Sequence, residues 1–323
     1  MLNSKKTIFA VIAILVIAAG VLFLVFANRD VSSRKVRVAV TNTALMAPLF
    51  VMHDLNLLEN HAPGIALELV VVDSGTVINE AFIAGSIDAA GLNVTNFLVG
   101  ADKSIPYGIL SSLAYGFNSV QTNAPDRIKS FADIAENDRI AVTTLTGSSA
   151  LLLYLASERY FGSYDALEGN IVTMNSADAL LALINKSGIT LAVSSLTERI
   201  KANEAGCVTI LEDTDIHNEG IMNNFLLFNK EFYEDNSDIA LCVLAALEDA
   251  IALIEIKDDR AISSITSRTG LDNDTFIEYL DLGFFKYVLD DFSTLEMVID
   301  ISHKVNLISS RPSVTDLILN SGQ

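Results

Sequence analysis

Short apolar runs alternate with amphipathic segments through the first two thirds of the chain. The apolar runs predict buried strands at 36–40, 66–72, 87–91, 107–116, 139–142, 170–175, 189–195 and 207–213. Segments with a helical pattern lie between them and begin near Pro48, Val77, Thr95, Ser148, Ala177 and Leu196. Strands that alternate with helices are typical of βαβ units, so we predict an α/β fold with largely parallel sheets.

The last third of the chain is predicted to be helical. Amphipathic patterns cover 237–256, 260–270, 273–285 and 293–308, and Asp or Asn stands near their starts, as N-caps require. The segments 79–97 and 178–196 also share one pattern of helix, small turn, strand and polar residues. We interpret the chain as two similar α/β lobes with a helical tail.

The N-terminal segment carries an uncharged apolar run, 8–27, behind Lys5 and Lys6. Twenty apolar residues suit a membrane span better than a signal-peptide core, yet 25–27 would serve as a cleavage site. A retained anchor and a cleaved signal therefore both remain open. No Cys follows the run, so it is not a lipoprotein signal, and either alternative predicts an exported body.

The net charge and the numbers of cysteines and histidines exclude several classes of function. The net charge is −19, from 40 acidic and 21 basic residues, which argues against a nucleic-acid partner and requires any anion site to be local. Cys207 and Cys242 lie in apolar contexts, the first in the second lobe and the other in the helical tail, and we predict that they are not bonded to each other. The four histidines have no metal-ligand spacing, so we expect no metal and no cofactor.

Small polar residues follow most of the predicted strands. Because ligands of parallel α/β sheets bind outside the carboxyl ends of the strands, these residues are the candidate binding site. They are Thr41, Asn42, Ser74, Gly75, Asn93, Thr95, Thr144, Gly147, Ser148, Ser149, Asn175, Ser194 and Ser195, with Ser176 expected to cap the next helix. Hydroxyls and amides without charge favour a hydrogen-bonding cleft rather than catalysis.

The stretch Thr-Gly-Ser-Ser, 146–149, has two interpretations. Ser148 or Ser149 would cap the following helix, with Gly147 giving the turn its freedom. Alternatively, the free N–H groups and the positive end of the helix dipole would hold an anionic or polar group of a ligand between the lobes.

Catalytic motifs are absent from the sequence. It contains no GxSxG elbow, no Walker loop and no GxGxxG fingerprint. His53 beside Asp54 would make a base, but a surface position on a helix explains the pair equally well.

The order of several motifs resembles the ABC-transporter solute-binding proteins of the nitrate/sulfonate/taurine type, which have thiamine-pyrimidine-binding relatives. These motifs are TNTALMAPLFVMHDLNLLE, VVDSGTVINEAFIAGSIDAAGL, TLTGSSALLLYLA, NNFLLFNKEFYEDN and VNLISSRPSVTDLI. The resemblance covers residues 36–323, and SGTVINEAFIAGSIDAA is its most specific part.

The resemblance implies a two-lobe type II periplasmic-binding-protein fold that clamps a small organic or anionic solute between its lobes. It divides the chain into a signal-anchor and linker (1–35), lobe 1 (36–117), lobe 2 (118–224) and a second crossing with the helical completion of lobe 1 (225–323). The crossing segments would be 112–123 and 220–230, with Asn223 and Asn224 facing the cleft. We expect 36–323 to fold as a soluble monomer without the N-terminal segment.

The resemblance also implies partners, namely a permease and an ATPase in the membrane. The chain departs from the family in having no Trp and no Arg or Lys in the mapped loops, so no anion clamp is visible. We therefore predict the extracytoplasmic solute-binding component of an importer, and not an enzyme. The alternatives are a membrane-tethered ligand sensor and, with less support, an enzyme of pyrimidine metabolism on the same fold.

Overall fold

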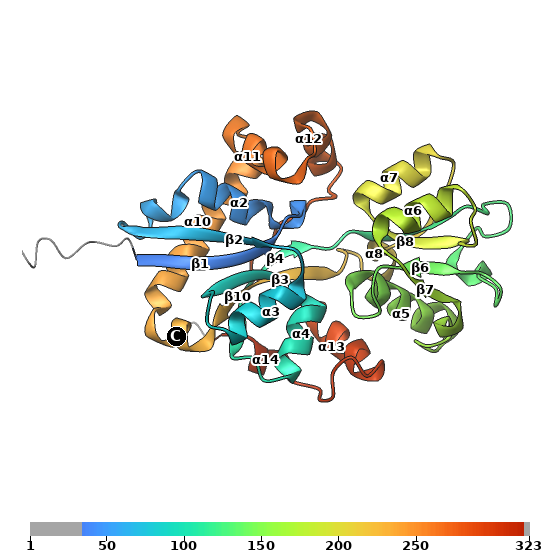
Figure 1. Ribbon diagram of the computed structural model, residues 1–323, viewed down its shortest axis with the longest axis horizontal. Coiled ribbons are helices and arrows are strands. Elements are labelled where there is room, and N and C mark those ends of the chain that lie inside the picture. Colours follow the sequence, from blue (N-terminus) through green and yellow to red (C-terminus); the bar gives the residue numbers. More distant parts are fainter. Residues whose placement is uncertain (1–33, 320–323) are drawn as a thin grey trace, which may run out of the picture.

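Two five-stranded sheets form the two halves of the molecule (Figure 1). The computed structural model describes residues 34–319. The first sheet has the order β2-β1-β3-β10-β4, with β1 (Arg34–Thr41), β2 (Ile65–Val72), β3 (Ala89–Asn93), β4 (Tyr107–Tyr115) and β10 (Met222–Asn229). The second has the order β7-β6-β8-β5-β9, with β5 (Asn118–Thr122), β6 (Ile140–Val142), β7 (Ile171–Thr173), β8 (Leu191–Ser195) and β9 (Val208–Glu212). We call the first sheet with its helices lobe 1 and the second sheet with its helices lobe 2.

Both sheets follow one plan. In each, three neighbouring strands are parallel: β2, β1 and β3 in lobe 1, and β7, β6 and β8 in lobe 2. The fourth position is taken by an antiparallel strand, β10 in lobe 1 and β5 in lobe 2. The largely parallel α/β architecture predicted from the sequence is therefore confirmed, and each sheet adds one antiparallel strand that the pattern did not predict.

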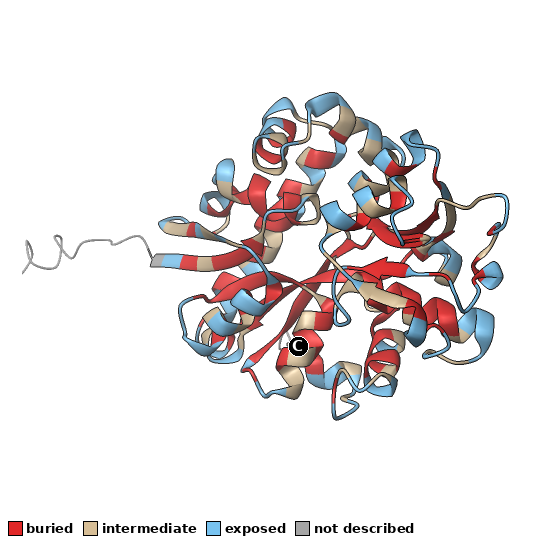
Figure 2. Ribbon diagram, turned by 45° about the vertical axis from the view of Figure 1, so that its right-hand side comes forward, coloured by how far each residue is buried: buried red, intermediate tan, exposed pale blue. Residues whose placement is uncertain are grey.

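Helices cover both faces of the sheet of lobe 1. The helices and short helical turns of this lobe are η1 (Ala44–Met46), α2 (Ala47–Asp54), η2 (Leu57–Asn60), α3 (Gly75–Ile83), α4 (Val94–Asp102), α9 (Lys230–Asp235), α10 (Ser237–Glu255), α11 (Asp259–Thr269), α12 (Asn273–Asp281), α13 (Leu295–Lys304) and α14 (Val314–Leu317). Apolar residues of α2, α10 and α11 pack on one face, and those of α3, α4 and α13 pack on the other. The inner strands β3 and β10 and the strand β4 are buried almost throughout, as Figure 2 shows, whereas the edge strand β2 is buried only at Leu67.

Lobe 2 is smaller and has two cores of its own. Its helical segments are η3 (Phe131–Asp133), α5 (Ser148–Phe161), η4 (Glu168–Asn170), α6 (Ser176–Ile184), α7 (Leu196–Glu204) and α8 (Asp213–Ile216). Residues of α5 pack on one face of the sheet, and residues of α6 and α7 pack on the other. Both lobes thus present the carboxyl ends of their parallel strands, and the starts of the following helices, toward each other.

The connections between the lobes are shorter than the sequence suggested. Residues 112–123 hold the end of β4 and all of β5, which leaves only Gly116 and Phe117 between the two strands. Residues 220–230 are chiefly β10, a buried central strand of lobe 1 rather than a crossing, so the second connection is 217–221. The run from Met222 to Phe228 is buried throughout, which is why it forms a central strand.

Two further predictions concern the termini and the cysteines. The apolar run 8–27 lies outside the described residues, and among residues 34–319 no helix is both long and apolar enough to span a membrane. Cys207 and Cys242 are both free thiols, as predicted. Cys207 is buried in lobe 2, whereas the Cys242 thiol on α10 donates to the His61 carbonyl oxygen at 3.2 Å.

Candidate ligand cleft

A cleft of about 550 Å³ lies between the lobes, at the end of α7 that faces lobe 1. Lobe 1 contributes the loop after β1, the end of α11 and Phe285; the first connection contributes Phe117; and lobe 2 contributes the start of α7. The residues that line it are Asn42, Thr43, Ala44, Leu45, Phe117, Ser195, Leu196, Thr197, Glu198, Lys201, Thr269, Gly270, Leu271 and Phe285. Both lobes therefore furnish walls of the same cleft.

The lobe 1 wall is held by a polar network behind it. The Asn42 amide donates to the Arg268 carbonyl oxygen at 2.6 Å, which ties the loop after β1 to the end of α11. The Arg268 guanidinium makes two hydrogen bonds to Asp54, which also accepts from Ser264. Burial opposes ionisation of Asp54, but the bonds from Arg268, His53 and Ser264 outweigh it and lower the pKa of this carboxyl to about 2.

His53 belongs to the same hydrogen-bond network and has a structural role in it. Its Nδ1 lies 2.7 Å from Asp54 Oδ1, so the pair belongs to the packing of α2 against α11, and neither residue lines the cleft. Among the residues that the structure describes, no group of His, Cys, Asp and Glu has the arrangement of a metal site.

The lobe 2 wall is the first two turns of α7. Ser195 stands at the N-cap with an extended backbone, and its hydroxyl is hydrogen-bonded to Glu198. Thr197 and Lys201, four residues apart, share the helix face that lines the cleft. Within residues 34–319, Lys201 Nζ forms neither a hydrogen bond nor an ion pair, so its three donors remain available.

The chemistry of these walls is amphiphilic. Leu45, Phe117, Leu196, Leu271 and Phe285 form apolar surface. Several hydroxyls, the Asn42 amide, the Glu198 carboxylate and the Lys201 ammonium group lie among them. Such a cleft favours a small solute that has an apolar part and a polar or anionic head.

The predicted site residues fall into several groups in the structure. Asn42 and Ser195 line the cleft. Ser74, Asn93 and Asn175 are N-caps, whose side chains accept from the backbone N–H groups of Val77, Asn96 and Asp178. Asn175, not Ser176, is therefore the cap of α6, because an N-cap lies just outside the helix and Ser176 is its first residue.

The stretch 146–149 lies at a much narrower part of the boundary between the lobes. Thr146 and Gly147 share a space of about 10 Å³ with Thr95 of α4 and with Ile301 and Ser302 of α13. The N-terminus of α5 therefore faces lobe 1, while Thr144 is exposed beside it.

The capping interpretation of this stretch is wrong. Gly147 is the N-cap of α5 and no side chain caps the helix, since Ser148 and Ser149 are already helical. The Ser149 hydroxyl instead contacts Thr143, at 3.4 Å from its backbone nitrogen and 3.0 Å from its Oγ1. Gly147 has φ −96° and ψ 174°, an extended conformation open to any residue, so the turn does not require its freedom.

The remaining candidates are mostly buried. Gly75 opens α3, and a Cβ there would lie 2.7 Å from Asn96, so this glycine permits close packing. Ser194 is buried within β8, and Thr41 ends β1. Asn223 and Asn224 are buried in β10, where Asn223 Oδ1 and Asn224 Nδ2 have no hydrogen-bond partner within the described chain.

Phe117, Thr197, Glu198, Lys201, Leu271 and Phe285 line the cleft but were not predicted from the sequence. One feature of the sequence could have indicated Lys201. Residues four apart share a helix face, so a binding residue in the first turn of α7, such as Thr197, implies a second contact at Lys201, one turn later. For Leu271 and Phe285 no local signal exists, because they reach the cleft only through the packing of α11 and α12.

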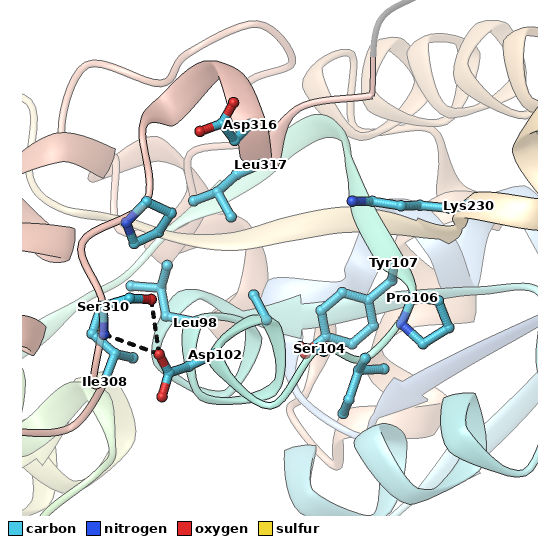
Figure 3. A pocket seen from close by; sticks show the side chains of 13 residues that line it. Leu98, Asp102, Ser104, Pro106, Tyr107, Lys230, Ile308, Ser310, Asp316 and Leu317 are labelled. Atoms are coloured by element: carbon cyan, nitrogen blue, oxygen red, sulfur yellow. Dashed lines mark hydrogen bonds between the residues drawn. The ribbon is translucent and has the colours of Figure 1, made fainter.

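A second pocket, of about 440 Å³, lies in lobe 1 alone (Figure 3). Leu98, Ile105 and Leu317 contribute apolar surface. In Figure 3 Lys230 and Asp102 lie on opposite sides, and Asp102 is hydrogen-bonded to Ser310. No residue of lobe 2 lines this pocket, so movement of the lobes would not enclose a solute there.

Comparison with known proteins gives one family match. Residues 29–156 match the sequence profile of the NMT1-like family. No curated protein matches this chain in sequence.

Solved structures share the two-lobe fold at low sequence identity. The periplasmic aliphatic sulphonate binding protein of Escherichia coli has a TM-score of 0.75 and 19% identity, over 90% of this chain and 94% of the other. The ligand binding component of an ABC-type import system from Staphylococcus aureus, with zinc bound, has a TM-score of 0.70 and 15% identity, over 89% and 97%. The alkanesulfonate-binding protein of Xanthomonas axonopodis pv. citri, bound to MOPS, has a TM-score of 0.69 and 16% identity, over 88% and 98%.

These matches confirm the predicted resemblance to solute-binding proteins of the nitrate/sulfonate/taurine type, and they confirm the two-sheet periplasmic-binding-protein fold.

Proposed function

We propose that this chain, which matches the NMT1-like family over residues 29–156 and has the fold of sulfonate-binding proteins, is the solute-binding component of an ABC importer. It captures a small organic anion between its lobes and does not transform it. Sulfonates are the first class to test, because the proteins of this fold from E. coli and X. axonopodis are sulfonate-binding proteins.

One observation carries this proposal: a cleft of about 550 Å³ is walled by residues of both lobes. A solute that contacts both walls binds best when the lobes are close together, which is how hinge closure captures a ligand. The Lys201 ammonium supplies local positive charge in a protein of net charge −19, and the helix dipole at the start of α7 adds to it.

The location and the partners follow from the same function. The body is extracytoplasmic, exported and held at the membrane by residues 8–27, and it delivers its solute to a permease that is driven by an ATPase. In this proposal Asn42 and Ser195, the predicted strand-end residues that line the cleft, contact the solute when the lobes close.

A thermal-shift screen of the purified protein tests the function. Aliphatic sulfonates, MOPS, carboxylates, nitrate, pyrimidines and nitriles would be compared, because a ligand that binds only the folded state raises the melting temperature. We expect sulfonates to give the largest shift. Consumption of a compound in place of stable binding would contradict a pure binding function.

The Lys201→Met variant tests the cleft itself. Loss of a charged hydrogen bond should weaken binding of the best sulfonate by about 1.5–3 kcal/mol, measured by calorimetry. The matched control is Lys129→Met, which makes the same change of charge at an exposed position of lobe 2 that does not line the cleft. Equal affinities of the two variants would remove Lys201 from the site.

A further inference from the structure

Three side chains of α7 extend from lobe 2 to lobe 1. Leu196, Arg199 and Ile200 are spaced three and four residues apart, so they share one face of the helix. Leu196 is only 5% exposed and belongs to the apolar cluster formed by α2, α10 and α11 of lobe 1, and Ile200 packs against the same cluster. This face of α7 is therefore bound to the neighbouring lobe.

Arg199 is the charged member of this face. The central carbon of its guanidinium lies 5.1 Å from the centre of the Phe117 ring and 5.3 Å from that of Phe284. The two rings pack edge to face, with their centres 4.6 Å apart. Phe117 belongs to the first connection, and Phe284 follows α12 in lobe 1, so one cation contacts two aromatic rings outside its own lobe.

Arg199 also forms an ion pair within its own lobe. Its Nη1 lies 2.8 Å from Glu212 Oε1, in an ion pair that is not aligned as a hydrogen bond. The Arg199 side chain is 18% exposed and that of Glu212 is 28% exposed, so solvent screens this pair less than a surface pair. Glu212 ends β9 and is the N-cap of α8, the last helix before the second connection.

The contacts of Arg199 lie beside the ligand cleft. Thr197 and Lys201 of the same helix line the cleft, and Phe117 forms part of its wall. We propose that Arg199 is a positioning residue that locks α7 onto lobe 1 and thereby sets the separation of the lobes at the cleft. This proposal does not depend on which solute is bound. In Figure 1, α7 and α12 lie on the same side of the molecule, one in each lobe.

A second contact between the lobes, on the side of α5, serves as an internal control for the effect of Arg199. On the side of α5, Leu151 and Leu155 are buried against lobe 1, and Glu158 forms an ion pair with Lys304 of α13. Leu151 and Leu155 belong to a different apolar cluster from Phe117 and Phe284. Loss of the Arg199 lock should therefore open the α7 side while the α5 side stays closed.

Hydrogen exchange of the full chain, measured by mass spectrometry, tests this. In Arg199→Met we expect exchange to accelerate about three- to thirtyfold in two facing segments, α7 and 279–287 of lobe 1. Exchange in α5 and α13 should not change. The matched control is Arg127→Met, which removes an ion pair with Asp138 inside lobe 2 alone and should leave both segments as they are.

Two further variants test whether Arg199 holds the two lobes together or only stabilises its own helix. Phe284→Leu removes the lobe 1 ring and keeps the Arg199–Glu212 pair, yet it should accelerate exchange in α7 on the other lobe. Arg199→Lys retains the cation and should recover most of the protection. The proposal is overturned if Arg199→Met affects α7 but leaves 279–287 unchanged, if Phe284→Leu leaves α7 unchanged, or if Arg127→Met has the same effect.

Discussion

At the scale of single residues, Asp213 has the least usual environment. It is buried at the start of α8, where Oδ2 accepts from the Asn118 backbone nitrogen at 2.6 Å and Oδ1 has no partner within the described chain. Burial raises the pKa of this carboxyl to about 7, and the bonds from Asn118 only partly offset it. Because Asn118 begins β5 just after the first connection, Asp213 joins the two chain segments that lead to the connections.

We predict that Asp213 makes the protein less stable as the pH rises. Its folded-state pKa is above that of an unfolded Asp, so between about pH 4 and pH 7 the folded state binds more protons and the free energy of unfolding falls. Asp213→Asn should remove this pH dependence. Between pH 4 and pH 8, the free energy of unfolding of the wild type should therefore fall by on the order of 1–4 kcal/mol more than that of the variant.

Urea unfolding at several pH values measures the difference between the variant and the wild type. Asp126→Asn, at an exposed position of lobe 2, is the control and should follow the wild type at each pH. A variant whose stability runs parallel to that of the wild type from pH 4 to pH 8 would show that Asp213 does not titrate in this range.

At the scale of elements, the N-terminus of α5 shows how neighbouring serines differ. Ser149 contacts Thr143 through its hydroxyl and is buried, whereas within the described chain the Ser148 hydroxyl makes no hydrogen bond. The Ser148 hydroxyl and the first N–H groups of the helix are therefore the donors that remain for a ligand at the boundary between the lobes.

We expect the two alanine variants to separate stability from binding. Ser149→Ala should cost about 0.5–1.5 kcal/mol of unfolding free energy, since it removes a buried hydrogen bond. Ser148→Ala should change stability by less than about 0.5 kcal/mol, as at an ordinary surface site. If the helix end holds the solute, Ser148→Ala should still weaken binding of the best sulfonate, as calorimetry would show. Unchanged affinity in Ser148→Ala would remove this hydroxyl from the site.

At the scale of the whole molecule, β1 is the first strand that the structure describes, and it is an inner strand. It lies between β2 and β3 in the sheet of lobe 1, and Val36, Val38 and Val40 are buried in the core beneath α2 and α10. An edge strand could be trimmed at modest cost, but removal of this inner strand would leave β2 without a partner and β3 paired only with β10.

Truncation tests this boundary. A protein that starts at Arg34 should be monomeric by size-exclusion chromatography and should unfold cooperatively, because it keeps all of β1. A protein that starts at Asn42 lacks β1 and should fail to fold, as circular dichroism would report. Aggregation of the longer protein under several expression conditions would contradict the prediction that the body folds without the N-terminal segment.

The sequence by itself determined the local elements of this protein. Runs such as 36–40 and 66–72 became β1 and β2 because short apolar stretches rich in Val and bounded by polar residues favour strands. It also predicted that polar residues would gather at strand ends, since all parallel strands of a sheet end at one edge.

Tertiary structure alone decided the rest. The sequence does not show that β5 and β10 enter their sheets as antiparallel strands, because that depends on partners far along the chain. Nor does it show which polar side chains are used as caps, as Asn93 and Asn175 are, and which face the cleft, as Asn42 does. Lys201, Arg199 and Asp213 gain their roles only when the lobes and their connections pack together, because charge, burial and ring contacts depend on distance in space rather than in sequence.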